Sequence, residues 1–71
     1  MSPADLAAWR ARMAYSQRDA AAALGVALRT YQVLERGAQF GTDKPVQIDR
    51  RTELACAALA AGITTWSPPT A

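Results

Sequence analysis

Arginine and glutamine side chains between Ser16 and Gly37 carry the most specific chemistry in this 71-residue sequence. A guanidinium group presents N–H donors in a planar fork, which suits paired hydrogen bonds to a guanine edge or to phosphate oxygens. A glutamine amide both donates and accepts, so it can bond to an adenine edge or to a phosphate. Five such side chains lie in the segment: Gln17, Arg18, Arg29, Gln32 and Arg36. These residue types favour recognition of a nucleic acid.

The same sequence offers little for catalysis or for metal binding. It contains no histidine and a single cysteine, Cys56, which excludes a histidine-based acid–base pair and a zinc site. Cys56 lies in an apolar run and is better explained by packing than as a nucleophile. The carboxylates are scattered, and Gly37 and Gly41 do not make a phosphate-binding loop. We therefore expect no enzymatic activity, no cofactor, no metal and no small-molecule ligand.

Length and composition predict one small domain. A chain of 71 residues builds a small core that is marginally stable alone, and oligomerisation is a common remedy. The sequence has no run of about 18 apolar residues and no cationic stretch before an apolar one, so neither a membrane span nor a signal peptide is indicated. The lone Cys56 excludes an internal disulfide and suits a reducing cytoplasm. The net charge of +2 says less about a partner than the placement of the charges.

Two helices joined by a tight turn are predicted to position the polar side chains. Ser16 opens the first helix with a capping-box carboxylate three residues later, and Gly25 closes it with left-handed geometry. The second helix begins at about Leu28 and turns Tyr31 and Leu34 inward, three residues apart. This is the layout of a helix-turn-helix, in which the second helix enters the major groove of DNA.

A further helix is predicted on each side of this pair. Ser2 caps the helix before it, and Pro3 occupies that helix's first turn. The inward stripe of this first helix consists of Leu6, Trp9 and Met13. A loop over residues 37–48 separates the pair from the last helix, which Asp49 caps and which runs to about Ala61.

These elements predict an all-α fold class, a compact four-helix domain over residues 1–62 that contains the helix-turn-helix. Residues 63–71, which include two prolines, are predicted to form an extended and partly disordered C-terminal tail.

The segment from Gln17 to Gly37 resembles the helix-turn-helix of the Cro/repressor type, a large family of bacterial and phage regulators. The matching positions are Gln17, Ala21, Gly25, Val26, Tyr31 and Leu34, with the ending Leu34-Glu35-Arg36-Gly37. Residues 5–62 fit the family's succession of helices, which implies a lambda-repressor-like fold. Ala27 departs from the pattern, because Ser or Thr usually caps the recognition helix there. The chain's size and its Cys-, Ala- and Leu-rich last helix are also similar to small regulators encoded beside anti-CRISPR genes.

Arg10 and Glu35 both occupy unfavourable positions if each is considered alone. Arg10 falls on the apolar stripe of the first helix, where a charge is rarely buried without a partner. Glu35 lies near the end of the third helix, where a carboxylate opposes the helix dipole. Either the two residues form an ion pair between these helices, or both are solvated surface charges. The family resemblance implies the ion pair.

The outward face of the third helix is predicted to contact the bases of double-stranded DNA. The expected base-contacting residues are Leu28, Arg29, Gln32 and Val33, and Arg29 is the best candidate because its fork fits guanine O6 and N7. Leu28 and Val33 would lie against thymine methyl groups, with peripheral packing as the alternative. The expected phosphate-contacting residues are Gln17, Arg18, Arg36 and Lys44. Arg18 sits at the positive end of a helix dipole, which an external anion would compensate, although a merely exposed arginine is the alternative.

The last helix is predicted to supply a dimer interface. Residues 54–61 are apolar on every side, and one face packed on the core cannot account for that. The expected interface residues are Cys56, Ala60, Ile63 and Trp66. An exposed apolar patch usually marks an interface, although alanine is also simply a good helix former.

The sequence therefore predicts a homodimeric, sequence-specific DNA-binding protein in the cytoplasm of a bacterial host cell. It would repress transcription by occupying an inverted-repeat operator, and would autoregulate its own operon of phage, mobile-element or anti-CRISPR type. One alternative is the antitoxin of a toxin–antitoxin pair that also binds its own promoter. Another is a helix-turn-helix scaffold that does not bind DNA.

Overall fold

Four helices account for the regular structure of the computed structural model, which describes residues 1–69. They are α1 (Pro3–Arg12), α2 (Gln17–Leu24), α3 (Leu28–Arg36) and α4 (Arg50–Ala60). The only β-type pairing among the described residues is an isolated bridge between Ala38 and Pro45. The all-α, four-helix fold class is therefore confirmed.

Side-chain caps explain where three of the helices begin. Ser2 and Ser16 each accept from the backbone N–H three residues later, at 3.1 and 3.0 Å, and their own N–H groups donate to Asp5 and Asp19. Asp49 caps α4 by accepting from a backbone N–H at 2.9 Å. These local bonds need no tertiary partner, so they determine helix starts directly from the sequence. In contrast, Ala27 gives α3 no side-chain cap.

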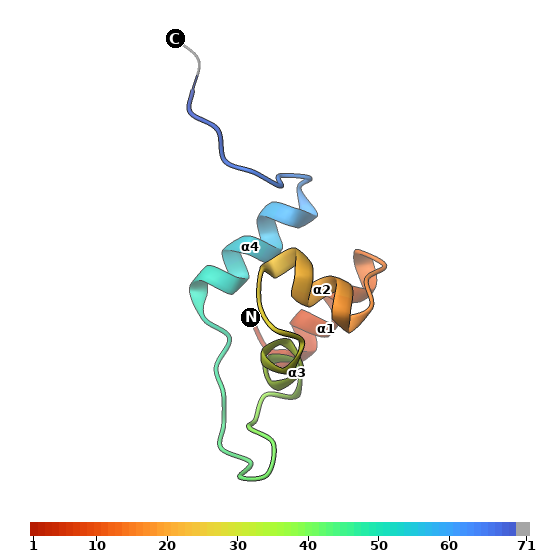
Figure 1. Ribbon diagram of the computed structural model, residues 1–71, viewed down its shortest axis with the longest axis vertical. Coiled ribbons are helices and arrows are strands. Elements are labelled where there is room, and N and C mark those ends of the chain that lie inside the picture. Colours follow the sequence, from red (N-terminus) through yellow and green to blue (C-terminus); the bar gives the residue numbers. More distant parts are fainter. Residues whose placement is uncertain (70–71) are drawn as a thin grey trace.

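The core lies where α1, α2 and α3 meet, and α4 closes it from one side. Its buried members are Leu6, Trp9, Ala20, Ala21, Tyr31 and Cys56. Two small alanines on the buried face of α2 allow α3 to approach it closely. The indole N–H of Trp9 donates to the backbone carbonyl of Cys56 at 3.0 Å, which ties α1 to α4. Figure 1 shows α4 beside α2.

The segment between α3 and α4 forms a defined turn, where the sequence predicted only a loop. The Gln39 N–H donates to the Lys44 carbonyl at 2.8 Å, and the Val46 N–H donates to the Gly37 carbonyl at 3.0 Å. The chain turns between these bonds with left-handed backbone at Gly41 and Asp43. We call residues 38–45 the hairpin turn. It projects from the end of the molecule opposite to the C-terminal segment (Figure 1).

Beyond α4 the chain leaves the helical body. Residues 63–69 are exposed and lie outside any helix, and Figure 1 shows them running away from α4. The last two positions of the tail predicted over 63–71 lie outside the described residues. Among residues 1–69, no helix has the length and apolar character needed to cross a membrane.

Gly37 ends α3 at a point where two constraints coincide. Its φ of +80° is left-handed, and a Cβ at this position would lie 2.8 Å from the Pro3 Cγ atom of α1. Gly25 has a similar φ of +71°, but a Cβ there would meet nothing within 4 Å. A side chain at Gly25 would meet backbone strain alone, whereas a side chain at Gly37 would meet both strain and a steric clash.

We predict that Gly37→Ala destabilises the protein more than Gly25→Ala. Left-handed strain costs about 1–2 kcal/mol at either position, and the clash with Pro3 adds about 1 kcal/mol or more at Gly37. Urea denaturation of the two variants measures the difference in the free energy of unfolding. Equal decreases in the free energy of unfolding would show that α1 shifts at Pro3 and relieves the clash.

Candidate nucleic-acid interface

A two-pronged ion pair joins α1 to α3. The Arg10 Nε atom lies 2.9 Å from Glu35 Oε2, and Arg10 Nη2 lies 2.9 Å from Glu35 Oε1. The two side chains are only 28 and 13 % exposed, so the pair is largely shielded from solvent. The ion pair expected from the positions of Arg10 and Glu35 is therefore present in the structure. It explains why a charge interrupts the apolar stripe of α1.

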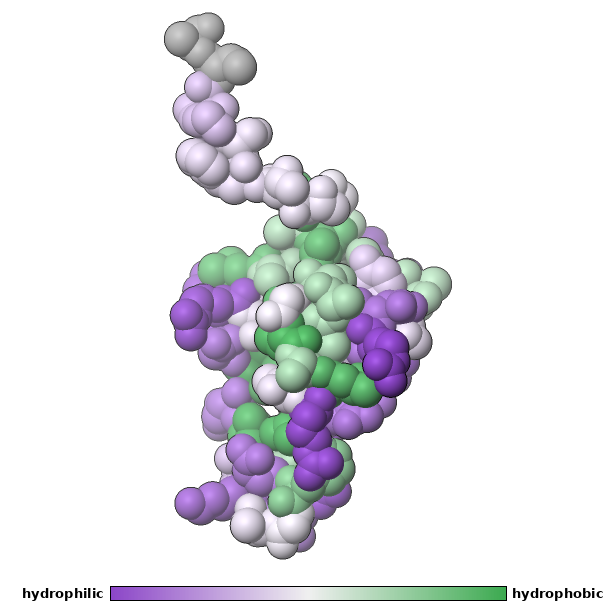
Figure 2. Space-filling view, viewed as in Figure 1, coloured by the Kyte–Doolittle hydropathy of each residue, from purple (hydrophilic) through white to green (hydrophobic). Residues whose placement is uncertain are grey.

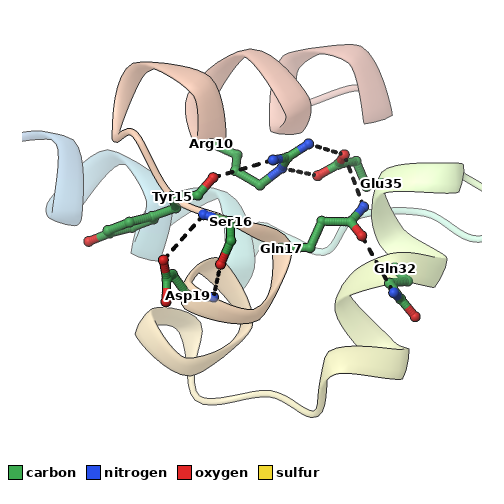
Figure 3. A network of polar contacts seen from close by, with 7 residues as sticks. All are labelled: Arg10, Tyr15, Ser16, Gln17, Asp19, Gln32 and Glu35. Carbon is green, nitrogen blue, oxygen red and sulfur yellow. Dashed lines mark hydrogen bonds and ion pairs between the residues drawn. The ribbon is translucent and has the colours of Figure 1, made fainter.

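Further hydrogen bonds extend this pair to α2 (Figure 3). Arg10 donates to the Tyr15 carbonyl at 3.3 Å, just before α2 begins. The Gln17 amide donates to Glu35 Oε1 at 3.3 Å and accepts from Gln32 at 3.4 Å. One polar network thus joins α1, α2 and α3, and it fixes the angle at which α3 is held.

The network changes the ionisation of its members. Hydrogen bonding from the Arg10 guanidinium lowers the pKa of Glu35, and the Glu35 carboxylate raises the pKa of Arg10. Burial, together with the nearby Glu35 carboxylate, raises the pKa of Tyr31, whose hydroxyl has no well-formed hydrogen bond among the described residues. Glu35 and Arg10 therefore stay charged and Tyr31 stays neutral at neutral pH.

The exposed face of α3 carries three polar side chains in line. Arg29, Gln32 and Arg36 are spaced at i, i+3 and i+7, which places them on one face of the helix. With Gln17 and Phe40 they line one open hollow. Three residues predicted to contact DNA through α3, and one predicted through α2, are therefore brought together.

Both arginines of this face contact the hairpin turn. The guanidinium carbons of Arg29 and Arg36 lie 4.1 and 4.9 Å from the centre of the Phe40 ring. Arg36 also forms an ion pair with Asp43. Sequence reasoning missed Phe40 and Asp43, because the path of the hairpin turn is set by backbone bonds that the sequence pattern did not indicate.

The remaining cations predicted to contact phosphate lie at separate places. Arg18 is exposed in the first turn of α2, and Lys44 is exposed on the hairpin turn. Leu28 is half-buried at the start of α3. None of these three residues belongs to the polar network or lines the hollow beside Arg29 and Arg36.

The prediction that Val33 points outward was wrong. Its residue is only 8 % exposed. Val33, Leu34 and Val46 line one hollow, so the chain that returns from the hairpin turn covers this side of α3. Val33 therefore serves packing, the alternative that the sequence left open.

Cys56 was also wrongly placed at an outer face of α4. It is 1 % exposed, and burial raises the pKa of its thiol. The residue packs with Trp9 in the core, because its position on α4 faces α1 and α2. It belongs to the core and cannot line a dimer interface.

Several apolar side chains of α4 and of the segment after it are exposed. Leu54, Ile63 and Trp66 are 53, 57 and 83 % exposed, and Ala60 is also exposed. An open groove between α2, α4 and the segment after α4 is lined by Leu24, Ala55, Ala58, Leu59, Ile63 and Trp66. Figure 2 shows apolar surface gathered where α4 meets the C-terminal segment. Ala60, Ile63 and Trp66 therefore remain candidates for an interface, and Leu54 joins them.

Comparisons with protein-family models, with characterised proteins and with solved structures find no match to this chain.

We predict that Glu35→Gln lowers the free energy of unfolding at pH 7 by about 1–3 kcal/mol, because it leaves a partly shielded guanidinium without its carboxylate. The pKa of Glu35 is lowered in the folded state, so the pair's contribution is complete above the unfolded pKa of about 4.3 and is lost as pH falls through the folded value. The variant should therefore lose less stability than the wild type when pH is lowered from 5 to about 2. Urea denaturation across this range measures both effects.

Glu53→Gln is the matched control, since it removes a half-exposed carboxylate of α4 that bonds to the amino group of Met1. It should change stability at pH 7 by less than about 1 kcal/mol. Parallel pH profiles for the Glu35→Gln variant and the wild type would contradict the assigned role of the pair.

Proposed function

We propose that this protein is a sequence-specific DNA-binding transcriptional repressor that acts as a homodimer on an inverted-repeat operator. The observation that carries the proposal is the arrangement of α3. Its Arg29, Gln32 and Arg36 side chains line one open face, while Tyr31 is buried on the opposite side. A left-handed Gly25 joins α3 to α2, and this layout fits a helix-turn-helix with α3 as recognition helix.

In this proposal α3 enters the major groove of double-stranded DNA. Arg29 lies in the first turn of α3 and bonds to guanine O6 and N7. Gln32, one turn later, bonds to an adenine edge or a phosphate, and Leu28 contacts a thymine methyl group. Arg36 lies two turns after Arg29, where the helix leaves the groove, and it contacts phosphate.

The start of α2 supplies the second contact with the DNA backbone. The Asp19 N–H is taken by the Ser16 cap, so the site suited to a phosphate consists of the Gln17 and Arg18 N–H groups with the exposed Arg18 side chain. Gln17 uses one amide N–H to bond to Glu35, and its second N–H serves a phosphate. Lys44 on the hairpin turn adds a further phosphate contact.

Two copies are needed for useful affinity and specificity. One copy has a net charge of +2 and a single recognition helix, which supports only modest, salt-sensitive binding. The apolar groove beside α4, with Ile63 and Trp66, supplies the surface on which a second copy packs. Repression follows from occupation of a promoter in the bacterial cytoplasm, and the regulated operon is the protein's own, of phage or anti-CRISPR type.

One observation favours a second candidate function, an antitoxin that also binds its own promoter. Trp66 is 83 % exposed on a segment that leaves the helical body. A toxin that covers this segment and the adjoining groove would bury it. Co-purification with a stoichiometric second protein that buries Trp66 and the groove beside α4 would favour this function over a simple repressor.

We predict that Arg29→Ala and Arg18→Ala weaken DNA binding in different ways. Arg29→Ala should weaken binding to the operator by about 1–3 kcal/mol and leave binding to random DNA nearly unchanged, because it removes a base contact. Arg18→Ala should weaken binding to both DNAs and lower the salt slope by about one, because it removes a phosphate contact. Gel shifts with the upstream DNA of the gene, repeated over a range of salt, measure both.

Arg12→Ala serves as the control for loss of charge alone, since Arg12 is exposed at the end of α1 and does not line the hollow beside Arg29 and Arg36. Equal losses on operator and random DNA would assign Arg29 to phosphate contact. No preference of the wild type for any sequence would overturn the proposed function.

We predict that Ala60→Glu and Ile63→Glu dissociate the dimer, because each places a charge on its apolar surface. Sedimentation should show monomers at tens of micromolar, and binding should lose about 100-fold or more because one half-site is read at a time. Circular dichroism should show that each monomer stays helical. Ala4→Glu, at an exposed position of α1, is the control. A wild type that is monomeric and binds a single half-site tightly would contradict dimerisation.

A further inference from the structure

Phe40 occupies a position that core packing does not explain. It is 36 % exposed at the hairpin turn, and it is not among the residues that form or surround the core. Its ring lies instead against the guanidinium groups of Arg29 and Arg36. One exposed aromatic ring thus contacts both arginines of the proposed recognition face.

The hairpin turn holds Phe40 in a fixed place relative to α3. The Gln39 N–H donates to the Lys44 carbonyl at 2.8 Å, and the Asp43 N–H donates to the Gln39 carbonyl at 3.1 Å. These bonds bracket Phe40, and the bond from the Val46 N–H to the Gly37 carbonyl anchors the turn at the end of α3. The backbone that carries the Phe40 ring is therefore hydrogen-bonded to the end of α3, the helix that carries both arginines.

Contact with the Phe40 ring restricts the side chains of Arg29 and Arg36. They lie seven residues apart on one face of α3, and both converge on the same ring, although two like charges repel. The face of an aromatic ring carries partial negative charge and attracts both guanidiniums. Asp43 adds an ion pair to Arg36 from the same turn. A free arginine side chain samples many rotamers, and an interface gains affinity when this freedom is already restricted.

We propose that Phe40 is a positioning residue for base recognition: it holds Arg29 in the orientation that meets guanine and keeps Arg36 beside it for the DNA backbone. The proposal rests on the proposed function, because it assigns the hairpin turn a part in reading double-stranded DNA. Paired bonds to guanine O6 and N7 require the plane of the Arg29 fork to align with the base, so orientation affects specificity more than general affinity.

The test compares Phe40→Leu, which keeps an apolar side chain but removes the ring, with Phe40→Tyr, which keeps the ring. The probes are the tightest-binding duplex selected from a random library with the wild type, and a scrambled duplex of equal length. Phe40→Leu should lower the ratio of the two affinities by about tenfold, and Phe40→Tyr should restore it to within about twofold. Ala4→Ser, at an exposed position of α1 outside the proposed DNA and dimer surfaces, is the control and should leave the ratio unchanged.

A double-mutant cycle shows whether Phe40 acts through Arg29. In an Arg29→Ala background, Phe40→Leu should lower the ratio by less than about twofold, because the side chain that it positions is gone. Independent effects that multiply in the double variant would overturn the proposal and assign Phe40 a separate contact with DNA. An unchanged ratio in Phe40→Leu alone would overturn it as well.

Two further measurements test the contact between Phe40 and the arginines without DNA, and distinguish failure of this inference from failure of the proposed function. NMR of the DNA-free protein should show ring-current shifts of the Arg29 and Arg36 side-chain protons that disappear in Phe40→Leu and persist in Phe40→Tyr; their absence in the wild type would overturn the proposal without any DNA measurement. A library that yields no preferred duplex for the wild type would overturn the proposed function, and this inference with it. Wild-type selection combined with an unaffected Phe40→Leu variant would overturn only the inference.

Discussion

The paired hydrogen bonds between Arg10 and Glu35 are the interaction on which the rest of the arrangement depends. A core this small contains few large apolar side chains, so apolar packing alone leaves the angle between helices loosely fixed. The two directional hydrogen bonds at 2.9 Å, together with the bond from Gln17 to Glu35, restrict the angle between α1 and α3 further. Burial of charge gains little stability in itself, and its value lies in fixing one geometry.

The residues that pack α3 against the core and the residues proposed to read DNA lie on opposite sides of this helix. Tyr31 packs inward against α1 and α2, and Glu35 fixes the helix laterally, which leaves Arg29 and Arg36 free of structural duties toward the core. Among residues 1–69, the ion pair and the cation–π contacts of the two arginines are made with the hairpin turn alone. The helix can therefore present polar side chains outward while its position is set by bonds that do not involve them.

Much of the fold follows from local signals. Ser2, Ser16 and Asp49 cap helices through bonds within three residues, so the sequence predicted the helix starts well, and the isolated charges of Arg10 and Glu35 indicated their pairing. Tertiary neighbours decided the rest. Helical spacing could not tell that the chain near Val46 covers Val33, and a uniformly apolar α4 did not reveal which side carries Cys56. Phe40 carried no periodic signal, because its place depends on a turn.

The hairpin turn has a consequence for how this protein can change over time. Residues 39–44 are all exposed, and the turn is anchored by backbone bonds at its base. Substitutions within it therefore leave the core and the Arg10–Glu35 pair intact, yet they alter the surroundings of the two outward arginines. Such a segment can drift in sequence at low cost to folding. Related chains can thus diverge in the outward chemistry of α3 while they keep the same four helices.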